Sequence, residues 1–250
     1  MSLVRSAEEE PELTLTDPTM HKLIHFRLCP LSRSVRLALA ELDIEVELAE
    51  EKPWEWREEF LAVNPAGELP VLQVQDGPTL CGVYAISEYL GDGIDGETDE
   101  EPTLSLFPGD RAARAEARRL VDWFNGKMQR EATQELLLEK VYARLLPGAD
   151  PSPAADVLRA IRTNLRYHLA YVNHLAHQRR WLAGEELSFA DLAAAAHLST
   201  VDYLGEVPWE EFPVAKVWYQ RVKSRRAFRS LLADRMPGAA PSAHYTDLDF

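Results

Sequence analysis

The stretch Asn64-Pro65-Ala66-Gly67-Glu68-Leu69-Pro70-Val71-Leu72 decides the fold of the first part of this chain. Pro70 stands at the mouth of the short apolar run 69–74. A proline cannot donate a ladder hydrogen bond, so it belongs at the first residue of a strand or at a sheet edge. An X-Pro bond is also the one peptide bond that readily becomes cis. A cis Leu69–Pro70 bond would turn the backbone N–H and C=O of Leu69 outward, free to pair with a peptide-like ligand.

The residues on either side of this stretch alternate between strand and helix patterns. Strand patterns cover residues 21–26, 44–48, 69–74 and 79–81. Helix patterns cover residues 31–42, 54–63 and 84–90. The Asp76-Gly77 pair between the last two strands is a strong hairpin signal. The resulting order βαβαββα predicts an α/β thioredoxin-like domain over residues 20–91.

The second half of the chain is helical by every local sign. Long amphipathic stretches cover 111–146 and 157–176, and Pro147-Gly148 ends the first of them. Ser188-Phe189-Ala190-Asp191 is a capping box directly before an alanine-rich run. These patterns predict an all-helical domain over residues 110–234. The glycine-bearing acidic segment 92–109 cannot pack a core, so it is typical of a solvated linker.

These motifs resemble the glutathione transferase superfamily. Cys29-Pro30-Leu31-Ser32 resembles the Cys-Pro-Phe-Ala pattern of omega-type transferases, and the capping box follows Trp181-Leu182-Ala183-Gly184 as it does in that superfamily's second domain. The resemblance runs from about His21 to about Asp234. It implies a thioredoxin-like N-terminal domain followed by a transferase-type C-terminal helical domain. It also implies a homodimer.

Cys29 is the candidate catalytic residue. A thiol just before a helix start has its thiolate stabilised by unpaired backbone N–H groups and by the helix dipole. Arg33 and Arg36 add positive charge nearby, so we expect a lowered thiol pKa. Ser32 stands where a dithiol motif would carry its second cysteine, which leaves only a one-cysteine glutathione exchange. The alternative is that Cys29 is an inert buried residue kept by the fold.

The resemblance places a glutathione site at Leu69, Pro70, Gly82 and Val83. Where the family usually carries an acidic residue and a serine for the γ-glutamyl group, this chain has Gly82-Val83. These two residues keep the backbone N–H groups of a helix start and remove both side chains. Losing one charged hydrogen bond costs on the order of 1.5–3 kcal/mol, and losing two would weaken binding by about a hundredfold or more. We therefore expect a degenerate pocket, with glutathione at most a weak ligand or cosubstrate and no resident cofactor.

The two ends of the chain have a different composition from the domains. Residues 1–19 are acidic with little apolar periodicity, and we expect a disordered tail there. Residues 235–250 end in His244-Tyr245-Thr246-Asp247-Leu248-Asp249-Phe250. A segment that alternates acids with aromatic and aliphatic residues suits docking in a groove or on a sheet edge, so it is a candidate recognition tail. The alternative is a tail that packs back on its own domain.

The ending, the Cys-Pro-Leu-Ser motif and the missing acid–serine pair together resemble the FtsZ-binding, glutathione-transferase-like division proteins of alphaproteobacteria. That family shares the transferase fold and dimer and acts by binding the tubulin-like protein FtsZ and shaping its filaments. The resemblance implies partner contacts at four residues of the tail. They are Tyr245, Asp247, Leu248 and Phe250.

Composition excludes several classes of function. A formal net charge of −14 argues against nucleic acid as the main partner, because phosphate binding needs clustered cations. The apolar runs are too short to span a bilayer, and no signal peptide is expected. Two cysteines exclude a disulfide framework and fit a reducing cytoplasm. The histidines show no metal-ligand spacing, so no metal site is expected.

Two hypotheses for function follow. The first is a dimeric cytoplasmic adaptor with a degenerate glutathione site that binds FtsZ filaments in cell division. The alternative is an enzyme, either a glutathione S-transferase or a glutathione-dependent thiol reductase, that works through Cys29. Binding to glutathione-agarose and co-sedimentation with FtsZ distinguish the two.

Overall fold

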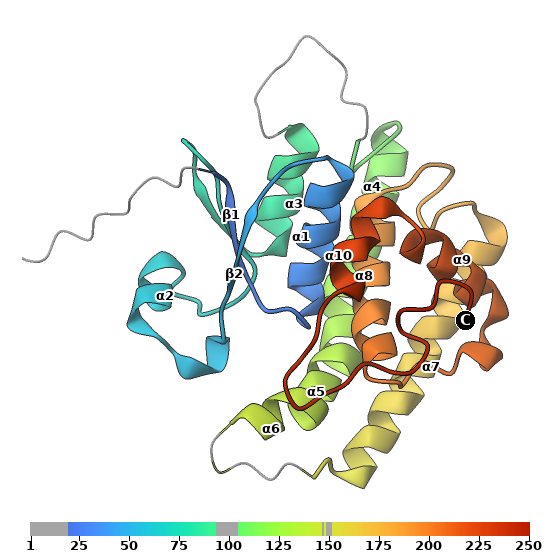
Figure 1. Cartoon of the computed structure of the whole chain (residues 1–250). Coiled ribbons are helices and arrows are strands. Elements are labelled where there is room, and N and C mark those ends of the chain that lie inside the picture. Colours follow the sequence, from blue (N-terminus) through green and yellow to red (C-terminus); the bar gives the residue numbers. More distant parts are fainter. Residues whose placement is uncertain (1–19, 94–104, 147, 149–151) are drawn as a thin grey trace, which may run out of the picture.

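The computed structural model describes residues 20–93, 105–146, 148 and 152–250. A small part with a sheet lies beside a larger helical part, and the last residues of the chain run across the helical part (Figure 1). The tail expected over residues 1–19 lies outside the described residues. So do residues 94–104 of the expected linker.

The sheet has four strands in the order β2-β1-β3-β4. They are β1 (Lys22–His25), β2 (Glu47–Glu50), β3 (Val71–Gln73) and β4 (Thr79–Cys81). β1 pairs in parallel with β2, which needs a crossover helix, whereas β3 pairs antiparallel with both β1 and β4. Asp76 forms the β3–β4 turn with φ of +52°, a conformation that Asp tolerates better than most residues. The hairpin prediction is confirmed.

Helices cover both faces of this sheet. They are α1 (Pro30–Glu41), the 3₁₀ turn η1 (Pro53–Glu55), α2 (Glu58–Val63) and α3 (Val83–Asp92). α1 begins with Pro30, whose fixed φ suits the first helical position. α1 and α3 lie between the sheet and the helical part, and α2 lies on the outer side (Figure 1). α1 makes the most extensive contact with the helical part, chiefly against α8 (Phe189–Tyr203).

The helical part begins with one long rod and continues through shorter helices. The rod comprises α4 (Arg111–Asp122), η2 (Trp123–Thr133), α5 (Gln134–Leu137), η3 (Leu138–Tyr142) and α6 (Ala143–Leu145). The helices after it are α7 (Ala155–Gln178), α8 (Phe189–Tyr203), η4 (Trp209–Glu211), α9 (Pro213–Lys223), η5 (Arg226–Phe228) and α10 (Arg229–Leu232). η2 and η3 are π-helical, which the amphipathic pattern of the sequence did not indicate.

α8 is the centre of the helical part, and every one of its residues is buried. Its small side chains let α1 and η2 pack closely against it. The predicted capping box is present, and the Asp191 carboxylate accepts from the Ser188 N–H (3.1 Å), the Leu182 N–H (2.8 Å) and the Trp218 indole N–H (3.0 Å). Burial nevertheless raises the pKa of Asp191 to about 6. This one carboxylate joins the start of α8 to α9.

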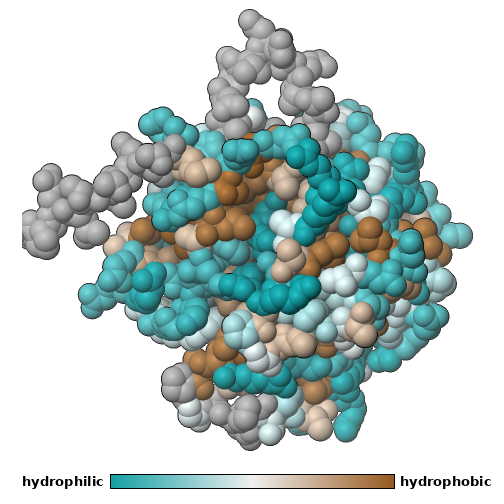
Figure 2. All heavy atoms as spheres, in the orientation of Figure 1, coloured by the Kyte–Doolittle hydropathy of each residue, from teal (hydrophilic) through white to brown (hydrophobic). Residues whose placement is uncertain are grey.

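The predicted fold class is confirmed: a thioredoxin-like part is followed by an all-helical part. The face drawn in Figure 2 is largely hydrophilic, with hydrophobic residues gathered in separate patches. Within the described ranges no helix has both the length and the apolar character to cross a bilayer. In the same ranges, no group of three or more His, Cys, Asp or Glu side chains is placed to hold a metal ion.

Candidate functional site

Cys29 occupies the N-cap position of α1, as the sequence predicts. Its backbone is extended (φ −68°, ψ 117°), and Pro30 follows at the first helical position. The backbone and hydroxyl of Ser32 and the backbone of Leu31 favour the thiolate and so act to lower the pKa of the thiol. The Ser32 hydroxyl also accepts from the Phe26 N–H at 3.4 Å. The helix start therefore offers donors to the sulfur.

The expected low thiol pKa is wrong. Burial raises the pKa of Cys29, and it outweighs the opposing hydrogen bonds from Ser32 and Leu31 and the charge of Arg33. Cys29 is only 8% exposed, so the thiolate would lose most of its hydration. The two arginines expected to help are engaged elsewhere, because Arg33 and Arg36 both bind the Asp234 carboxylate, at 3.1 Å and 2.8 Å. Cys29 is a protonated thiol at neutral pH.

Aromatic rings pack in the same buried apolar cluster as Cys29. Trp54 from η1 and Tyr142 from η3 stand 4.7 Å apart between ring centroids, and the Phe26 ring lies 5.1 Å from Trp54 and 5.6 Å from Tyr142. Burial raises the pKa of Tyr142, and the neighbouring Cys29 adds to that rise. This aromatic lid is thus built from both parts of the protein. We expect it to restrict the access of a ligand thiol to Cys29.

The four residues of the predicted glutathione site flank the β3–β4 hairpin, with Leu69 and Pro70 before β3 and Gly82 and Val83 after β4. The Leu69–Pro70 peptide bond is cis, as expected. Leu69 and Cys29 belong to one buried apolar cluster, and the Gly82 N–H donates to the Pro70 carbonyl at 2.9 Å. The structure therefore brings Leu69 to the cluster that holds Cys29 and Gly82 to Pro70, whereas Val83 packs against the other buried cluster.

The helix start at Gly82 is less available than the sequence predicts. Its N–H group was expected to remain free for a ligand, but the bond to Pro70 occupies it. Gly82 has φ of +87°, and a Cβ atom built there would meet no atom within 4 Å. Val83 turns toward the core between the two parts and is half-buried there. No side chain at these two positions can bind a carboxylate or an amino group.

The C-terminal tail packs on its own domain, which decides between the two alternatives left open by the sequence. Tyr245 is fully buried, and its hydroxyl accepts from the Arg33 guanidinium at 3.1 Å and donates to the Leu231 carbonyl at 3.0 Å. Its ring lies 5.1 Å from that of Tyr203 at the end of α8. The prediction of Tyr245 as a partner contact therefore fails for the docked tail, because a partner cannot touch a ring inside the core.

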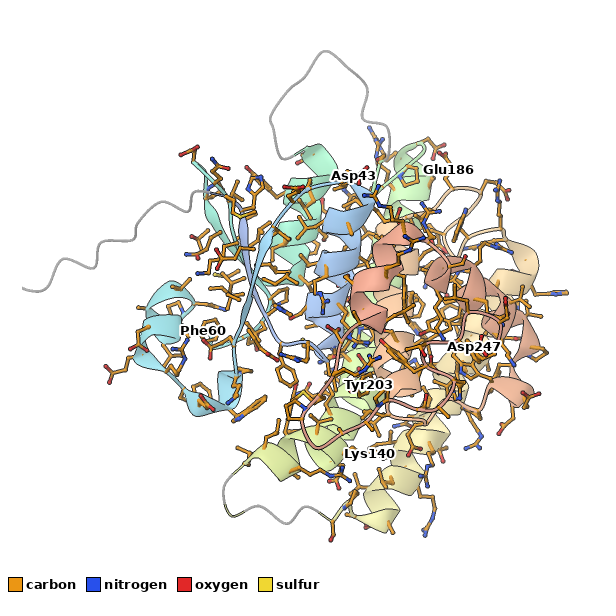
Figure 3. All side chains as sticks on the ribbon, in the orientation of Figure 1. Asp43, Phe60, Lys140, Glu186, Tyr203 and Asp247 are labelled. Carbon is orange, nitrogen blue, oxygen red and sulfur yellow. The ribbon has the colours of Figure 1, made fainter. Side chains whose placement is uncertain are left out.

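A buried ion pair between Lys223 and Asp202 anchors the rest of the tail. The Lys223 ammonium lies 3.6 Å from the Asp202 carboxylate, and both side chains are fully buried. Lys223 also donates to the Asp247 carbonyl at 2.7 Å, while Asp202 accepts from the His244 imidazole at 2.8 Å. Figure 3 shows Tyr203 at the end of α8 and Asp247 on the C-terminal tail. The tail is held by its backbone and by His244 as well as by Tyr245.

The remaining tail residues differ in exposure. Phe250 is half-buried, and its ring lies 4.1 Å from the Lys223 ammonium and 5.4 Å from the Trp209 ring. Asp247 is exposed, and Leu248 is 40% exposed. Of the four predicted partner contacts, Asp247 and Leu248 lie on the surface, Phe250 lies at its edge, and Tyr245 lies inside.

The anchoring residues of the tail were not found from the sequence. The sequence indicates Arg33 only as a charge near the thiol, and no motif in it points to Asp202 or Lys223. They lie 212, 43 and 22 positions from Tyr245, so no local pattern connects them with it. The fully buried position of a lysine or an aspartate is the signal that reveals them, and only the structure supplies it.

Family models match the two parts of the chain in the same order. The model described as "Glutathione S-transferase, N-terminal domain" matches residues 23–97, and that described as "Glutathione S-transferase, C-terminal domain" matches residues 133–226. The chain belongs to the glutathione S-transferase family. Cys29 at the start of α1, the cis Leu69–Pro70 bond and the capped helix α8 therefore lie in a chain with the fold of this family.

The individual relatives include an FtsZ-localized protein and glutathione S-transferases. FtsZ-localized protein A of Caulobacter vibrioides is 48% identical over 235 residues, which cover 93% of this chain and 98% of that protein. Glutathione S-transferase 2 of Saccharomyces cerevisiae is 28% identical over 221 residues, which cover 82% of this chain and 87% of that protein.

The similar solved structures are of the same two kinds, FzlA and a glutathione S-transferase. FzlA from C. crescentus matches with a TM-score of 0.85 at 45% identity, covering 92% of this chain and all of that one. A glutathione S-transferase from Rhodospirillum rubrum F11 matches with a TM-score of 0.86 at 46% identity and the same coverage. The resemblance drawn from the sequence is confirmed for the fold and for the similarity to FtsZ-localized protein A.

Proposed function

We propose that this protein is a dimeric cytoplasmic adaptor that binds FtsZ filaments in cell division. The observation that carries the proposal is the 48% identity to FtsZ-localized protein A over nearly the whole of both chains. The state of the thiol site supports it, since burial raises the pKa of Cys29 and the residue lies in a buried cluster with aromatic side chains. A binding role also needs no free pocket at that site.

We propose that the tail forms part of the surface that contacts FtsZ. Asp247 and Leu248 are exposed on a segment that buried anchors hold in one conformation. A preorganised segment loses little conformational entropy when it binds, so its affinity is higher than that of a loose peptide. On this proposal Tyr245 has a positioning role.

The homodimer is part of the proposal, and the face shared by α3 and α4 suits it. A cavity of about 240 Å³ lies there, between Val83 and Phe107. Tyr84 at its rim is 67% exposed. Arg118 stacks 4.4 Å from the Phe107 ring and forms two hydrogen bonds with Glu88, which gives the face a rigid edge. An apolar cavity beside an exposed tyrosine is suited to a self-complementary contact between two copies.

A glutathione-dependent enzyme is the second candidate. The observation that favours it is the arrangement of Cys29 beside the cis Leu69–Pro70 bond, which retains the family's frame. The enzyme would have to open the lid of Trp54 and Tyr142 for each turnover. Glutathione would be a weak cosubstrate, since Gly82 and Val83 offer its charged end no side chain.

Two measurements on the full chain test the proposal. Co-sedimentation with FtsZ filaments is expected for the wild type and expected to be lost on deletion of residues 244–250. Because that deletion also removes the Tyr245 anchor, Leu248→Arg serves as a surface variant that leaves the anchors intact. A thermal melt identifies any variant that has unfolded. Normal co-sedimentation by both variants would refute the role of the tail.

Retention on glutathione-agarose separates the two candidates. The adaptor is expected to pass through the column. Firm retention, together with a transferase activity that Cys29→Ala abolishes, would favour the enzyme and overturn the adaptor as the leading function. The homodimer is tested by sedimentation equilibrium, in which Tyr84→Glu is expected to shift the mass toward the monomer.

A further inference from the structure

We propose that the hollow between η4 and the C-terminal tail docks a basic, apolar segment of the partner protein. The hollow has a volume of about 560 Å³ and is lined by the η4 region on one side and by the tail on the other. This inference rests on the proposed adaptor function. It adds the binding surface and the chemistry of what the surface accepts.

The floor of the hollow is aromatic and exists because the tail is docked. Trp209 forms its base, and the Phe250 ring meets Trp209 edge-on at 5.4 Å. Phe250 also stacks on His244 at 5.0 Å and 23°. The Gln220 amide donates to the Phe250 backbone carbonyl at 3.0 Å, which fixes the end of the tail. An apolar side chain from a partner would find a rigid aromatic surface here.

The rim of the hollow is acidic. Glu210, Glu211 and Asp247 line it, against a single lining cation, Lys216. Glu211 is paired with Arg166 through two hydrogen bonds of 2.8 and 2.9 Å. Glu210 is different, because its side chain is 95% exposed and only a 3.5 Å contact links it to Lys216. Glu210 and Asp247 therefore present charge that the fold leaves largely to the solvent.

The Phe250 ring already has two cations beside it, since the Lys223 and Lys216 ammonium groups lie 4.1 Å and 5.2 Å from its centroid. The attraction for a basic segment therefore comes from the acidic rim, and the aromatic floor provides apolar contact. An acidic segment would meet three carboxylates and be repelled. Charge and apolar character together select a segment in which lysine or arginine alternates with aliphatic residues.

A peptide probe tests the surface without FtsZ. A fluorescent peptide of alternating lysine and leucine is expected to bind the full-length protein. Glu210→Lys should weaken that binding about tenfold, which corresponds to about 1.4 kcal/mol. Glu186→Lys is the matched control, since Glu186 is also an exposed acid and lies at a distance from Asp247 (Figure 3). A glutamate–leucine peptide is expected not to bind.

The same variants in co-sedimentation with FtsZ separate the two proposals. A wild type that binds FtsZ, with Glu210→Lys weakened and Glu186→Lys unchanged, supports both. If deletion of 244–250 abolishes binding to FtsZ while Glu210→Lys and Asp247→Lys leave it unchanged, the hollow is refuted and the adaptor stands. If the peptide binds in a Glu210-dependent way and FtsZ does not bind, the adaptor is refuted. If Glu210→Lys and Glu186→Lys weaken the binding of the lysine–leucine peptide equally, the hollow is refuted as a specific site.

Discussion

Tyr245→Phe removes a single oxygen atom from the centre of the tail anchor. The Tyr245 hydroxyl accepts from Arg33 at 3.1 Å and donates to the Leu231 carbonyl at 3.0 Å. The ring itself, packed on Tyr203, fits the same space without the hydroxyl. The substitution therefore measures the hydrogen bonds alone.

The expected loss of folding stability follows from the polar groups that lose a hydrogen-bond partner in the variant. One N–H of the buried Arg33 guanidinium loses its acceptor, and a bond to a charged group is worth about 1.5–3 kcal/mol. The Leu231 carbonyl also loses a donor, which adds about 1 kcal/mol. The Ser199 hydroxyl still binds Arg33 at 2.8 Å and limits the loss. We expect the free energy of unfolding to fall by about 3 kcal/mol, which lowers Tm by about 6–12 °C in a chain of this size.

Thermal melts followed by circular dichroism measure this change. Leu248→Ala is the matched control on the same segment, because its side chain is 40% exposed and should alter stability by less than about 0.5 kcal/mol. A Tyr245→Phe protein that melts within about 1 °C of the wild type would refute the anchoring role of the hydroxyl. It would return Tyr245 to the set of candidate partner contacts.

Three further predictions concern the thiol of Cys29 and His25, the last residue of β1. Cys81 is exposed and Cys29 is buried, so a thiol reagent should label Cys81 promptly and Cys29 only on unfolding, as peptide mapping would show. Tyr142→Ala opens the aromatic lid and should speed the labelling of Cys29 by tenfold or more; an unchanged rate would mean that Tyr142 is not the barrier. Burial, with the charge of Arg36 next, lowers the pKa of His25 to about 4, so the folded state resists protonation. Stability is then complete above about pH 6.5 and falls by about 2–3 kcal/mol as the pH drops toward 4, and His25→Gln should flatten this part of the urea-unfolding profile.

Local signals in the sequence predict the frame of the fold. The Asp76-Gly77 turn, the Pro30 helix start and the Ser188–Asp191 capping box each act within a few residues, and all three appear in the structure. The hairpin and the capped helix could be predicted because their causes lie in adjacent residues. The contact between Gly82 and Pro70 has the same kind of local cause, since the strand pairing there follows from the hairpin. The assignment of a glutathione site to these residues rests on the family resemblance and stays a prediction.

Long-range contacts decide what the sequence could not predict. The sign of the Cys29 pKa shift depends on burial, and the apolar cluster around Cys29 includes Tyr142, which is 113 positions away in the sequence. The local helix start favours the thiolate, but loss of hydration outweighs it. The anchoring of the tail likewise depends on Asp202 and Lys223.

The anchors also determine how a partner can use the tail. Pulling Tyr245 out of the core would leave Arg33 buried with fewer acceptors, and extracting Asp247 would remove an acceptor from the buried Lys223. Losing a hydrogen bond to a charged group of this kind costs about 1.5–3 kcal/mol. Contact with the docked tail at Leu248 and along the rim of the hollow costs none of this. On the proposed function, we therefore expect a partner to recognise the tail in place, as a formed surface, rather than as a released peptide.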